Sequence, residues 1–138
     1  MLTEWEVLLN VKGRMPMPPR PYQTALVYEV SKLFALGHRR VVVQLPTGGG
    51  KTQIASELVS RSKARRILYI VPSAEILEQT SKALERAGVE HTALTAGRKF
   101  RAAGQSCLLA MSQTLARRLG TVMFDGWAPD LIFVDECH

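Results

Sequence analysis

Residues 44–52 read Gln-Leu-Pro-Thr-Gly-Gly-Gly-Lys-Thr, a composition suited to binding phosphate. The apolar run Val41-Val42-Val43 precedes this stretch, and a helical pattern, Lys51 to Ser62, follows it. A strand, a glycine loop and a helix in that order are the context that a phosphate-binding loop requires. Glycines let the backbone approach a polyphosphate, and the start of the helix adds the positive end of its dipole. The stretch therefore predicts a nucleotide-phosphate site.

The residue types within the stretch suggest how the phosphates would be held. Lys51 has the reach for the terminal phosphates, and the Thr52 hydroxyl is a ligand that Mg²⁺ accepts. The strict phosphate-loop pattern has a glycine where this chain has Leu45. A plain glycine-rich turn with an exposed lysine is therefore the alternative. The flanking elements and the Lys-Thr pair favour the phosphate loop over that alternative.

A second stretch carries acidic residues at the end of an apolar run. Residues 131–134 read Leu-Ile-Phe-Val, and Asp135-Glu136-Cys137-His138 follow. An acidic pair at the end of a buried strand is where a phosphate-loop enzyme holds Mg²⁺ and its attacking water. Together the two stretches, in this order, predict a nucleoside triphosphatase more strongly than either does alone.

Alternating apolar runs and helical patterns must position these residues. The predicted strands are 41–45, 67–71, a weaker one at 91–95, 107–111 and 131–134. The predicted helices begin at Arg20, Lys51, Ala74 and after a cap at Ser112-Gln113-Thr114, and Ser73 is the predicted cap of the third. Such a pattern predicts an α/β fold, a parallel sheet with helices on both faces. Ligands of such sheets bind at the carboxyl ends of the strands, where the phosphate loop, Ser73, Ser112 and Asp135 would meet.

Composition places the chain among globular proteins. Its 138 residues carry a net charge of +6 and are 46% hydrophobic, enough for one domain with a core. No apolar run is long enough to span a bilayer, and the start of the chain lacks the form of a signal peptide, so we expect a cytoplasmic protein without a membrane partner. The positive charge favours a polyanionic partner. Residues 1–19, rich in proline at their end, are expected to be an extended lead-in to a domain at 20–138.

Two further segments leave alternatives open. From spacing alone, Arg20-Pro21-Tyr22-Gln23 is more simply the start of a helix than an adenine site, since proline is common there. Leu26, Val30, Leu33 and Phe34 are expected on the buried face of that helix. The loop Gly97-Arg98-Lys99-Phe100-Arg101 combines three cations with an aromatic ring, which suits nucleic acid, though a surface loop without a ligand has the same composition.

The motifs at 44–52 and 135–138, in that order, resemble motifs I and II of superfamily 2 helicases. The Asp-Glu-Cys-His form resembles the DEAD/DEAH-related branch, which includes the helicase subunits of type III restriction enzymes and RadD-like repair proteins. Arg20 to Gln23 resembles the adenine-recognising Q motif of that branch, which reverses the preference stated above. Val71-Pro72-Ser73 with residues 77–80 resembles motif Ia, and 111–115 resembles a nucleic-acid-contacting motif. The resemblance covers residues 20–138 and implies the first of two RecA-like domains, binding ATP and Mg²⁺.

The resemblance also implies a role for each matching residue. Asp135 would hold Mg²⁺ with Thr52, Glu136 would polarise the attacking water, and His138 would couple the nucleotide to the nucleic acid. Arg20 and Gln23 would contact the adenine. The triphosphate would be cradled by Thr47, Gly48, Gly49, Gly50 and Lys51. The nucleic-acid backbone, more readily DNA than RNA, would be contacted by Ser73, Arg98, Ser112 and Gln113.

The chain given stops at His138, whereas the family continues with motif III and a second RecA-like domain that carries an arginine finger. We therefore expect a fragment, truncated after motif II, that hydrolyses ATP hardly at all. A stand-alone nucleotide-binding module is the alternative. A phosphate-loop kinase fits less well, because no lid pattern follows the loop and the acidic pair suits water activation better than transfer to a substrate.

Overall fold

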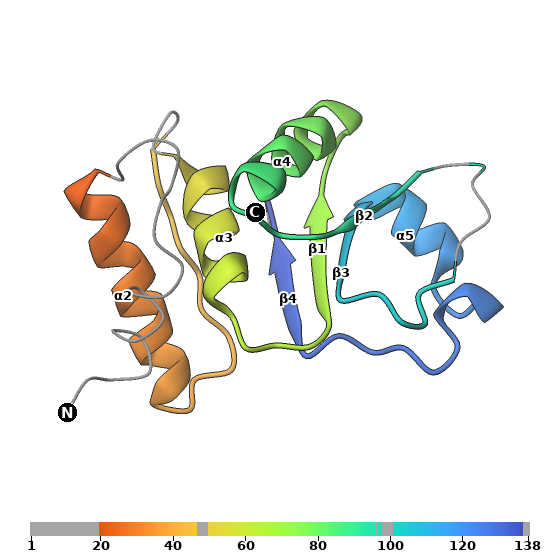
Figure 1. Ribbon diagram of the computed structural model, residues 1–138, viewed down its shortest axis with the longest axis horizontal. Coiled ribbons are helices and arrows are strands. Elements are labelled where there is room, and N and C mark those ends of the chain that lie inside the picture. The colour runs from red at the N-terminus through yellow and green to blue at the C-terminus, as the bar shows by residue number, and fades with distance from the viewer. Residues whose placement is uncertain (1–19, 47–49, 96, 98–100, 137–138) are drawn as a thin grey trace. The chain divides into compact units, whose positions relative to one another are not determined.

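The structure is a computed structural model that describes residues 20–46, 50–95, 97 and 101–136. The chain divides into two compact units, Met1–Ser62 and Lys63–His138, which we call the N-terminal and C-terminal units (Figure 1). Each is considered by itself below. No helix in the described ranges has both the length and the apolar character needed to cross a membrane.

The N-terminal unit contains two helices that contact each other, α2 (Pro21–Ala35) and α3 (Lys51–Arg61). Pro21 occupies the first position of α2, where its missing N–H costs nothing. Gly37 ends the helix with φ +94°, and the N–H of His38 donates to the carbonyl of Leu33 (3.1 Å). Both predicted helices are therefore confirmed.

The buried face of α2 differs from the predicted one. Val27 and Val30 are buried, together with the polar Gln23 and Ser31. Leu26 and Leu33 are only half-buried, and Phe34 remains 40% exposed. The prediction placed Leu26, Val30, Leu33 and Phe34 together on one face, and of these only Val30 is buried. Apolar side chains spread around α2, and periodicity alone does not show which of them are covered.

The predicted strand at 41–45 is wrong. Residues 41–46 belong to no helix or strand, and their exposure alternates, with Val42 82% exposed. The valine run has high strand propensity, but a strand also needs a neighbour to take up its N–H and C=O groups. No described residue pairs with this run.

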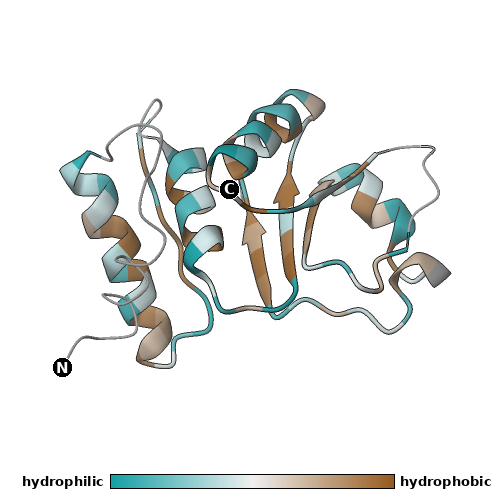
Figure 2. Cartoon of the chain, viewed as in Figure 1, coloured by the Kyte–Doolittle hydropathy of each residue, from teal (hydrophilic) through white to brown (hydrophobic). Residues whose placement is uncertain are grey.

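The C-terminal unit is built on a four-stranded parallel sheet, in the order β2-β3-β1-β4. The strands are β1 (Ile67–Val71), β2 (Thr92–Leu94), β3 (Cys107–Met111) and β4 (Leu131–Val134). They are apolar along their length, as Figure 2 shows for β1 and β4. Burial on both faces explains this composition for β1 and β3, whereas Ile132 and Val134 of β4 are 53% and 49% exposed. The four strands predicted for this unit are confirmed.

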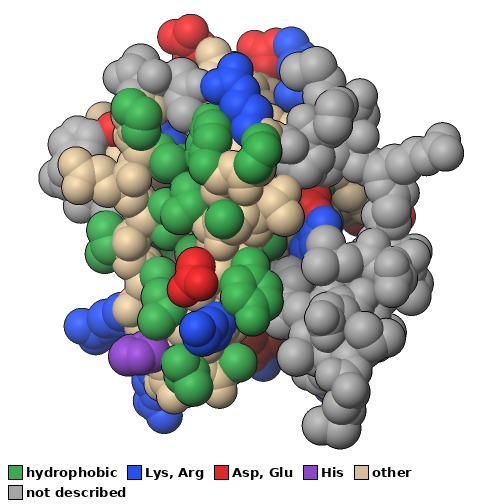
Figure 3. Space-filling model, turned by 90° about the vertical axis from the view of Figure 1, so that its left-hand side faces the viewer, with side chains coloured by type: hydrophobic (Ala, Val, Ile, Leu, Met, Phe, Trp, Pro, Cys, Tyr) green, Lys and Arg blue, Asp and Glu red, His purple; other side chains and the backbone are tan. Residues whose placement is uncertain are grey.

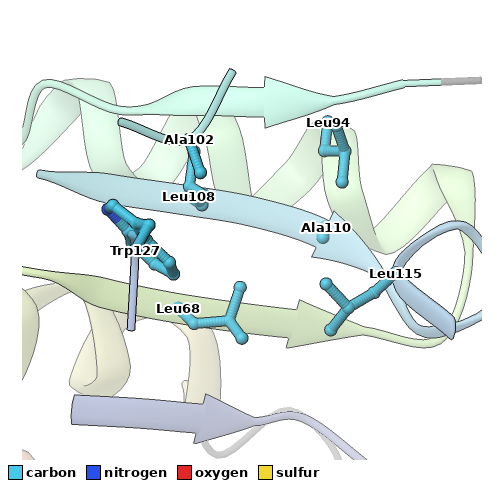
Figure 4. Close-up of a cluster of buried hydrophobic side chains, with 7 residues drawn as sticks. All are labelled: Leu68, Leu94, Ala102, Leu108, Ala110, Leu115 and Trp127. Carbon is cyan, nitrogen blue, oxygen red and sulfur yellow. The ribbon is translucent and has the colours of Figure 1, made fainter. Parts of the chain in front are cut away.

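Helices cover both faces of this sheet. On one face, side chains from three strands pack with Leu115 of α5 (Ser112–Arg118) and with Trp127 (Figure 4). The opposite face carries α4 (Ala74–Arg86), which contacts β1 and β3. The Trp127 indole N–H donates to the Gln105 carbonyl (2.9 Å), so its polar group is satisfied within the core.

Of the two helix caps predicted in this unit, one is confirmed and the other is wrong. The Ser73 Oγ accepts from the N–H of Ile76 (3.3 Å), which confirms it as the cap of α4. The predicted cap at Ser112-Gln113-Thr114 is wrong, because Ser112 is already the first residue of α5 and Met111 precedes the helix without a side-chain bond. The helix begins as soon as β3 ends, which leaves no residue between them to act as a polar cap.

Candidate functional site

Gly50 lies where the glycine stretch becomes helix α3, and two constraints exclude a side chain there. Its φ of +79° is in the left-handed region, which costs other residues strain. A Cβ placed on it would also overlap the side-chain amide nitrogen of Gln23. Gln23 is 4% exposed. The structure therefore brings the glutamine of the Q-like motif against the last glycine of the predicted phosphate loop.

The start of α2 fixes how Gln23 lies. Its Oε1 accepts from the backbone N–H of Arg20 (3.0 Å), an orphan donor at the helix start. With the oxygen held there, the amide nitrogen points toward Gly50. Arg20 is exposed, with its guanidinium 3.5 Å from the Tyr22 hydroxyl. The amide oxygen is thus held by the backbone of Arg20 while the amide nitrogen lies against Gly50, which fixes the orientation of the side chain.

Lys51 and Thr52 form the first turn of α3. Lys51 is exposed and Thr52 half-buried. The Ser56 hydroxyl donates to the Thr52 carbonyl (2.7 Å), so the backbone of this turn is braced from within the helix. A helix start that presents a lysine and a hydroxyl offers N–H groups and positive charge together, the combination that phosphate binding uses.

In the C-terminal unit, four predicted residues lie at one end of the sheet. Ser73, Ser112 and Asp135 follow the ends of β1, β3 and β4, which are parallel neighbours, and Gln113 follows Ser112. The Asp135 N–H donates to the Ile70 carbonyl (2.9 Å), which continues the ladder one residue beyond β4. Ser112 and Gln113 are exposed, whereas the Ser73 hydroxyl is engaged as a helix cap.

Glu136 shows a feature that sequence reasoning missed. It is the one described residue other than glycine with a positive φ, +57°. The left-handed conformation costs such a residue roughly 1–2 kcal/mol, and strain of this kind gathers at functional sites. No pattern in Asp135-Glu136 signals the conformation, because glutamate is not a residue that favours it.

Several predicted residues lie outside the described ranges. These are Thr47, Gly48, Gly49, Arg98 and His138, together with most of the predicted cationic loop and the lead-in at 1–19.

Each unit, taken by itself, carries groups of the kind that a Mg²⁺-nucleotide complex uses. Gly50 forms a cradle that a Cβ would fill, at the start of a helix that carries Lys51 and Thr52. Asp135 is a half-exposed carboxylate at a strand end. Mg²⁺ bound with phosphates takes only one or two protein carboxylates, so it does not require a cluster. Within the described ranges no group of three or more His, Cys, Asp or Glu residues forms a metal cage.

Comparison with known proteins agrees with this geometry. A search of curated proteins finds no match. The family model for the res subunit of type III restriction enzymes matches residues 16–138, nearly the whole chain. That match includes every motif described above, and the parallel α/β sheet is that of a RecA-like phosphate-loop domain. The chain belongs to the type III restriction enzyme res subunit family, as a helicase superfamily 2 N-terminal, ATP-binding domain.

Proposed function

We propose that this chain binds ATP with Mg²⁺ and hydrolyses it to drive movement on DNA, as the first RecA-like domain of a helicase or translocase. The observation that carries the proposal is Gly50, held in a conformation and a space that only glycine fits, with Gln23 against it and Lys51 next in the chain. The family supports the use of ATP and nucleic acid in its full-length members.

Each predicted residue has a role in this proposal. In the N-terminal unit, Arg20 and Gln23 contact the adenine, and Lys51 binds the terminal phosphates after Thr47, Gly48, Gly49 and Gly50. Thr52 and Asp135 are the protein ligands of Mg²⁺, which neutralises phosphate charge when bound. Glu136 accepts a hydrogen bond from the attacking water and takes its proton.

The nucleic-acid part of the proposal rests on the strand ends of the C-terminal unit. Ser112 and Gln113 are exposed polar residues suited to phosphate contacts, and Ser73 and Arg98 join them in the proposal, with His138 coupling the two ligands. Backbone contacts of this kind position a strand without reading its sequence. The preference for DNA over RNA rests on the resemblance to the DEAD/DEAH-related branch alone, because the net charge of +6 favours either nucleic acid.

The cytoplasmic location remains a prediction.

We further propose that efficient hydrolysis requires a second RecA-like domain that supplies an arginine finger. In related phosphoryl-transfer systems such a finger is worth about 10³–10⁵ in rate. The 138 residues alone are therefore expected to bind ATP and to turn it over hardly at all.

The test measures Mg²⁺-ATP binding and turnover of the 138-residue chain, with and without single-stranded DNA. Lys51→Ala should weaken the ATP affinity about 100-fold or more, which abolishes detectable binding, because the charge proposed to face the terminal phosphates is lost. Glu136→Gln should keep binding and remove residual turnover. Lys32→Ala, an exposed lysine near the end of α2, is the matched control and should bind ATP as the wild type does.

Wild-type binding by Lys51→Ala would contradict the phosphate-loop assignment. If the chain binds ATP but DNA changes neither binding nor turnover, even after a second RecA-like domain is added, a nucleotide-binding module without motor activity is favoured. Robust DNA-stimulated hydrolysis by the 138 residues alone would show that no second domain is needed.

A further inference from the structure

A groove lies at the end of the C-terminal sheet that the proposed nucleotide and nucleic-acid residues do not use. Residues 88–93 and 104–106 line it from the approaches to β2 and β3, together with Ser81 and Glu85 in the last turns of α4. These are the amino ends of the parallel strands, whereas Asp135 follows a carboxyl end. The volume of the groove, about 770 Å³, is in the range of small-ligand sites.

The first hydrogen-bonded pair in the groove is His91 with Ser81. The His91 Nδ1 lies 3.0 Å from the Val89 carbonyl oxygen, and its Nε2 lies 2.7 Å from the Ser81 Oγ. A carbonyl only accepts, so Nδ1 carries the hydrogen of the neutral ring and Nε2 accepts from the serine. The O–H of Ser81 is therefore engaged, and the serine offers a ligand only the lone pairs of its oxygen.

Thr92 and Gln105 form a second pair with the same polarity. The Thr92 hydroxyl donates to the Gln105 Oε1 (2.7 Å), which engages its O–H and leaves its oxygen as an acceptor. The Gln105 amide N–H groups remain donors. Both paired hydroxyls of the groove thus face a ligand as acceptors, and their polarity is set by the neighbouring side chains.

The charged groups that line the groove near pH 7.5, where imidazole is mostly neutral, are negative. Glu85 and Glu90 are exposed, and neither has an ion-pair partner among the described residues. No described lysine or arginine lines the groove. The end of α4 adds the negative end of its dipole and carbonyls without a helical partner. A groove of this kind suits a cation that donates several hydrogen bonds.

We propose that this groove binds a guanidinium group, either of a free small molecule or of an arginine side chain. Acceptors are offered by four side chains, those of Ser81, Glu85, Glu90 and Thr92. That is more than the three N–H groups of an ammonium can use, whereas a guanidinium has five N–H donors in one plane. The inference does not depend on the proposed function, because the groove lies at the other end of the sheet.

The test is an NMR titration of the 138-residue chain with L-argininamide near pH 7.5. Saturable shifts are expected in the backbone amides of residues 88–93 and 104–106, which line the groove. L-citrullinamide differs only by a neutral urea in place of the guanidinium. It should bind at least about tenfold more weakly, because its hydrogen bonds to the carboxylates carry no opposite charge.

Two variants test whether the groove itself holds the cation. Glu85→Gln removes one charge and should weaken argininamide binding about three- to fivefold. Glu75→Gln is the matched control, since it removes an exposed carboxylate from the first turn of the same helix and should leave the affinity unchanged. Ser106→Trp fills the groove from an exposed position without a change of charge and should abolish the shifts. All three positions are exposed, so the urea midpoints should stay as in the wild type.

A second ligand distinguishes the two sources of the guanidinium. Acetyl-Gly-Arg-Gly-amide carries the group within a peptide. If it binds at least as tightly as argininamide, the groove takes an arginine of a partner protein. If it binds about tenfold more weakly, the flanking peptide is excluded and the groove takes a free small molecule. Either result supports the inference.

Three outcomes would overturn the inference. The first is an absence of saturable shifts at millimolar argininamide, and the second is equal affinity for citrullinamide. The third is wild-type binding by Ser106→Trp or equal affinities of Glu85→Gln and Glu75→Gln, which would mean that surface charge in general attracts the cation. All three leave the proposed function intact.

Discussion

Two apolar runs that look alike in the sequence behave differently in the two units. Ile67–Val71 becomes β1, with a strand on each side and every residue except Ile70 buried. Residues 41–45 have no strand partner among the residues that the structure describes, and Val42 is 82% exposed. Both runs have strand propensity, so what separates them is the presence of a neighbour. A strand is therefore a property of the pair.

The same contrast extends to the surface. Among the described residues, five of the eight exposed large hydrophobic side chains belong to the N-terminal unit, namely Tyr22, Tyr28, Phe34, Leu36 and Val42. Figure 3, in which α2 faces the viewer, shows hydrophobic side chains gathered on that face. Two helices have too little surface to cover their own apolar residues, whereas β1 and β3, the inner strands of the C-terminal sheet, are covered by helices. We therefore expect a firm core in one unit only.

The largest expected difference between the units is in thiol reactivity. Cys107 is 2% exposed, and burial raises its thiol pKa from 9.0 to about 11. At pH 8 this lowers the thiolate fraction about 100-fold, and burial hinders the reagent as well. A Val42→Cys variant should react with a disulfide reagent more than about 100-fold faster than Cys107. Both proteins carry Cys137→Ser, and the Val42→Cys variant also carries Cys107→Ala, so each has one thiol. Stopped-flow labelling of the two proteins measures both rates.

The raised pKa also predicts a pH dependence of stability. The folded state holds the Cys107 proton more tightly than the unfolded state does, so its contribution is complete below pH 9 and is lost as pH rises from 9.0 toward about 11. Cys107→Ala should remove this loss. In the labelling experiment, equal rates at positions 42 and 107 would contradict the first prediction. They would mean that the C-terminal unit opens often enough for the reagent to reach Cys107 as easily as it reaches residue 42.

The second prediction concerns stability. Leu108→Ala removes a fully buried side chain at the centre of the sheet and should cost about 2–5 kcal/mol of unfolding free energy. Val42→Ala should change it by less than about 0.5 kcal/mol, because the side chain already faces water. Urea unfolding followed by Trp127 fluorescence, with Trp5 replaced by Phe, reports on the C-terminal unit and so on Leu108→Ala. The helical circular dichroism signal, to which α2 and α3 contribute, reports on the N-terminal unit and so on Val42→Ala. A cost above about 1 kcal/mol for Val42→Ala would mean that this run packs more firmly than its exposure indicates.

The third prediction compares two glycines of the N-terminal unit. Gly37 and Gly50 both have a positive φ, but only at Gly50 would a Cβ meet another side chain, that of Gln23. Gly37→Ala should therefore cost only backbone strain, about 1 kcal/mol, and Gly50→Ala about 2–4 kcal/mol. Gly50→Ala should also weaken ATP binding. Chemical unfolding and nucleotide titration measure the two effects.

A double variant tests whether the Gln23 contact causes the difference. Adding Gln23→Ala to Gly50→Ala removes the overlapping amide and should restore about 1–3 kcal/mol of the lost stability. Equal costs for the two glycine variants, or no restoration, would contradict the contact between Gln23 and Gly50.

Periodicity and caps predicted most of the C-terminal unit. Apolar runs of four or five residues that alternate with helical patterns predict β1, β3 and β4, and the weaker pattern at 91–95 predicts β2. The residue type and place of Ser73 predict it as a cap. The failures share a cause. Whether Val41–Leu45 finds a partner, and which apolar side of α2 is covered, depend on residues distant in the sequence, which a local pattern does not contain.

The site shows a similar division. Lys51, Thr52 and Asp135 could be named from local motifs, because chemistry ties residue type to spacing. The contact of Gln23 with Gly50 and the stacking of Tyr69 on Phe133 join residues that are 27 and 64 positions apart by their numbering. The left-handed backbone of Glu136 has no signal in residue type at all. Motifs therefore predict the groups proposed to contact ligands, and the structure adds contacts between residues distant in the sequence.

The smallest expected effect concerns that strained backbone. Glycine takes a φ of +57° without the strain that a side chain incurs, so Glu136→Gly should be more stable than Glu136→Ala by about 0.5–1 kcal/mol, after allowance for the extra freedom of glycine in the unfolded chain. At Gln79, exposed within α4, the order should reverse, with alanine better by about 1 kcal/mol. Urea unfolding of the four variants measures both differences. The same order at both positions would mean that residue 136 is not held in the left-handed region. The predicted order would mean that the C-terminal unit, firm elsewhere, gives up stability at the residue proposed to activate water.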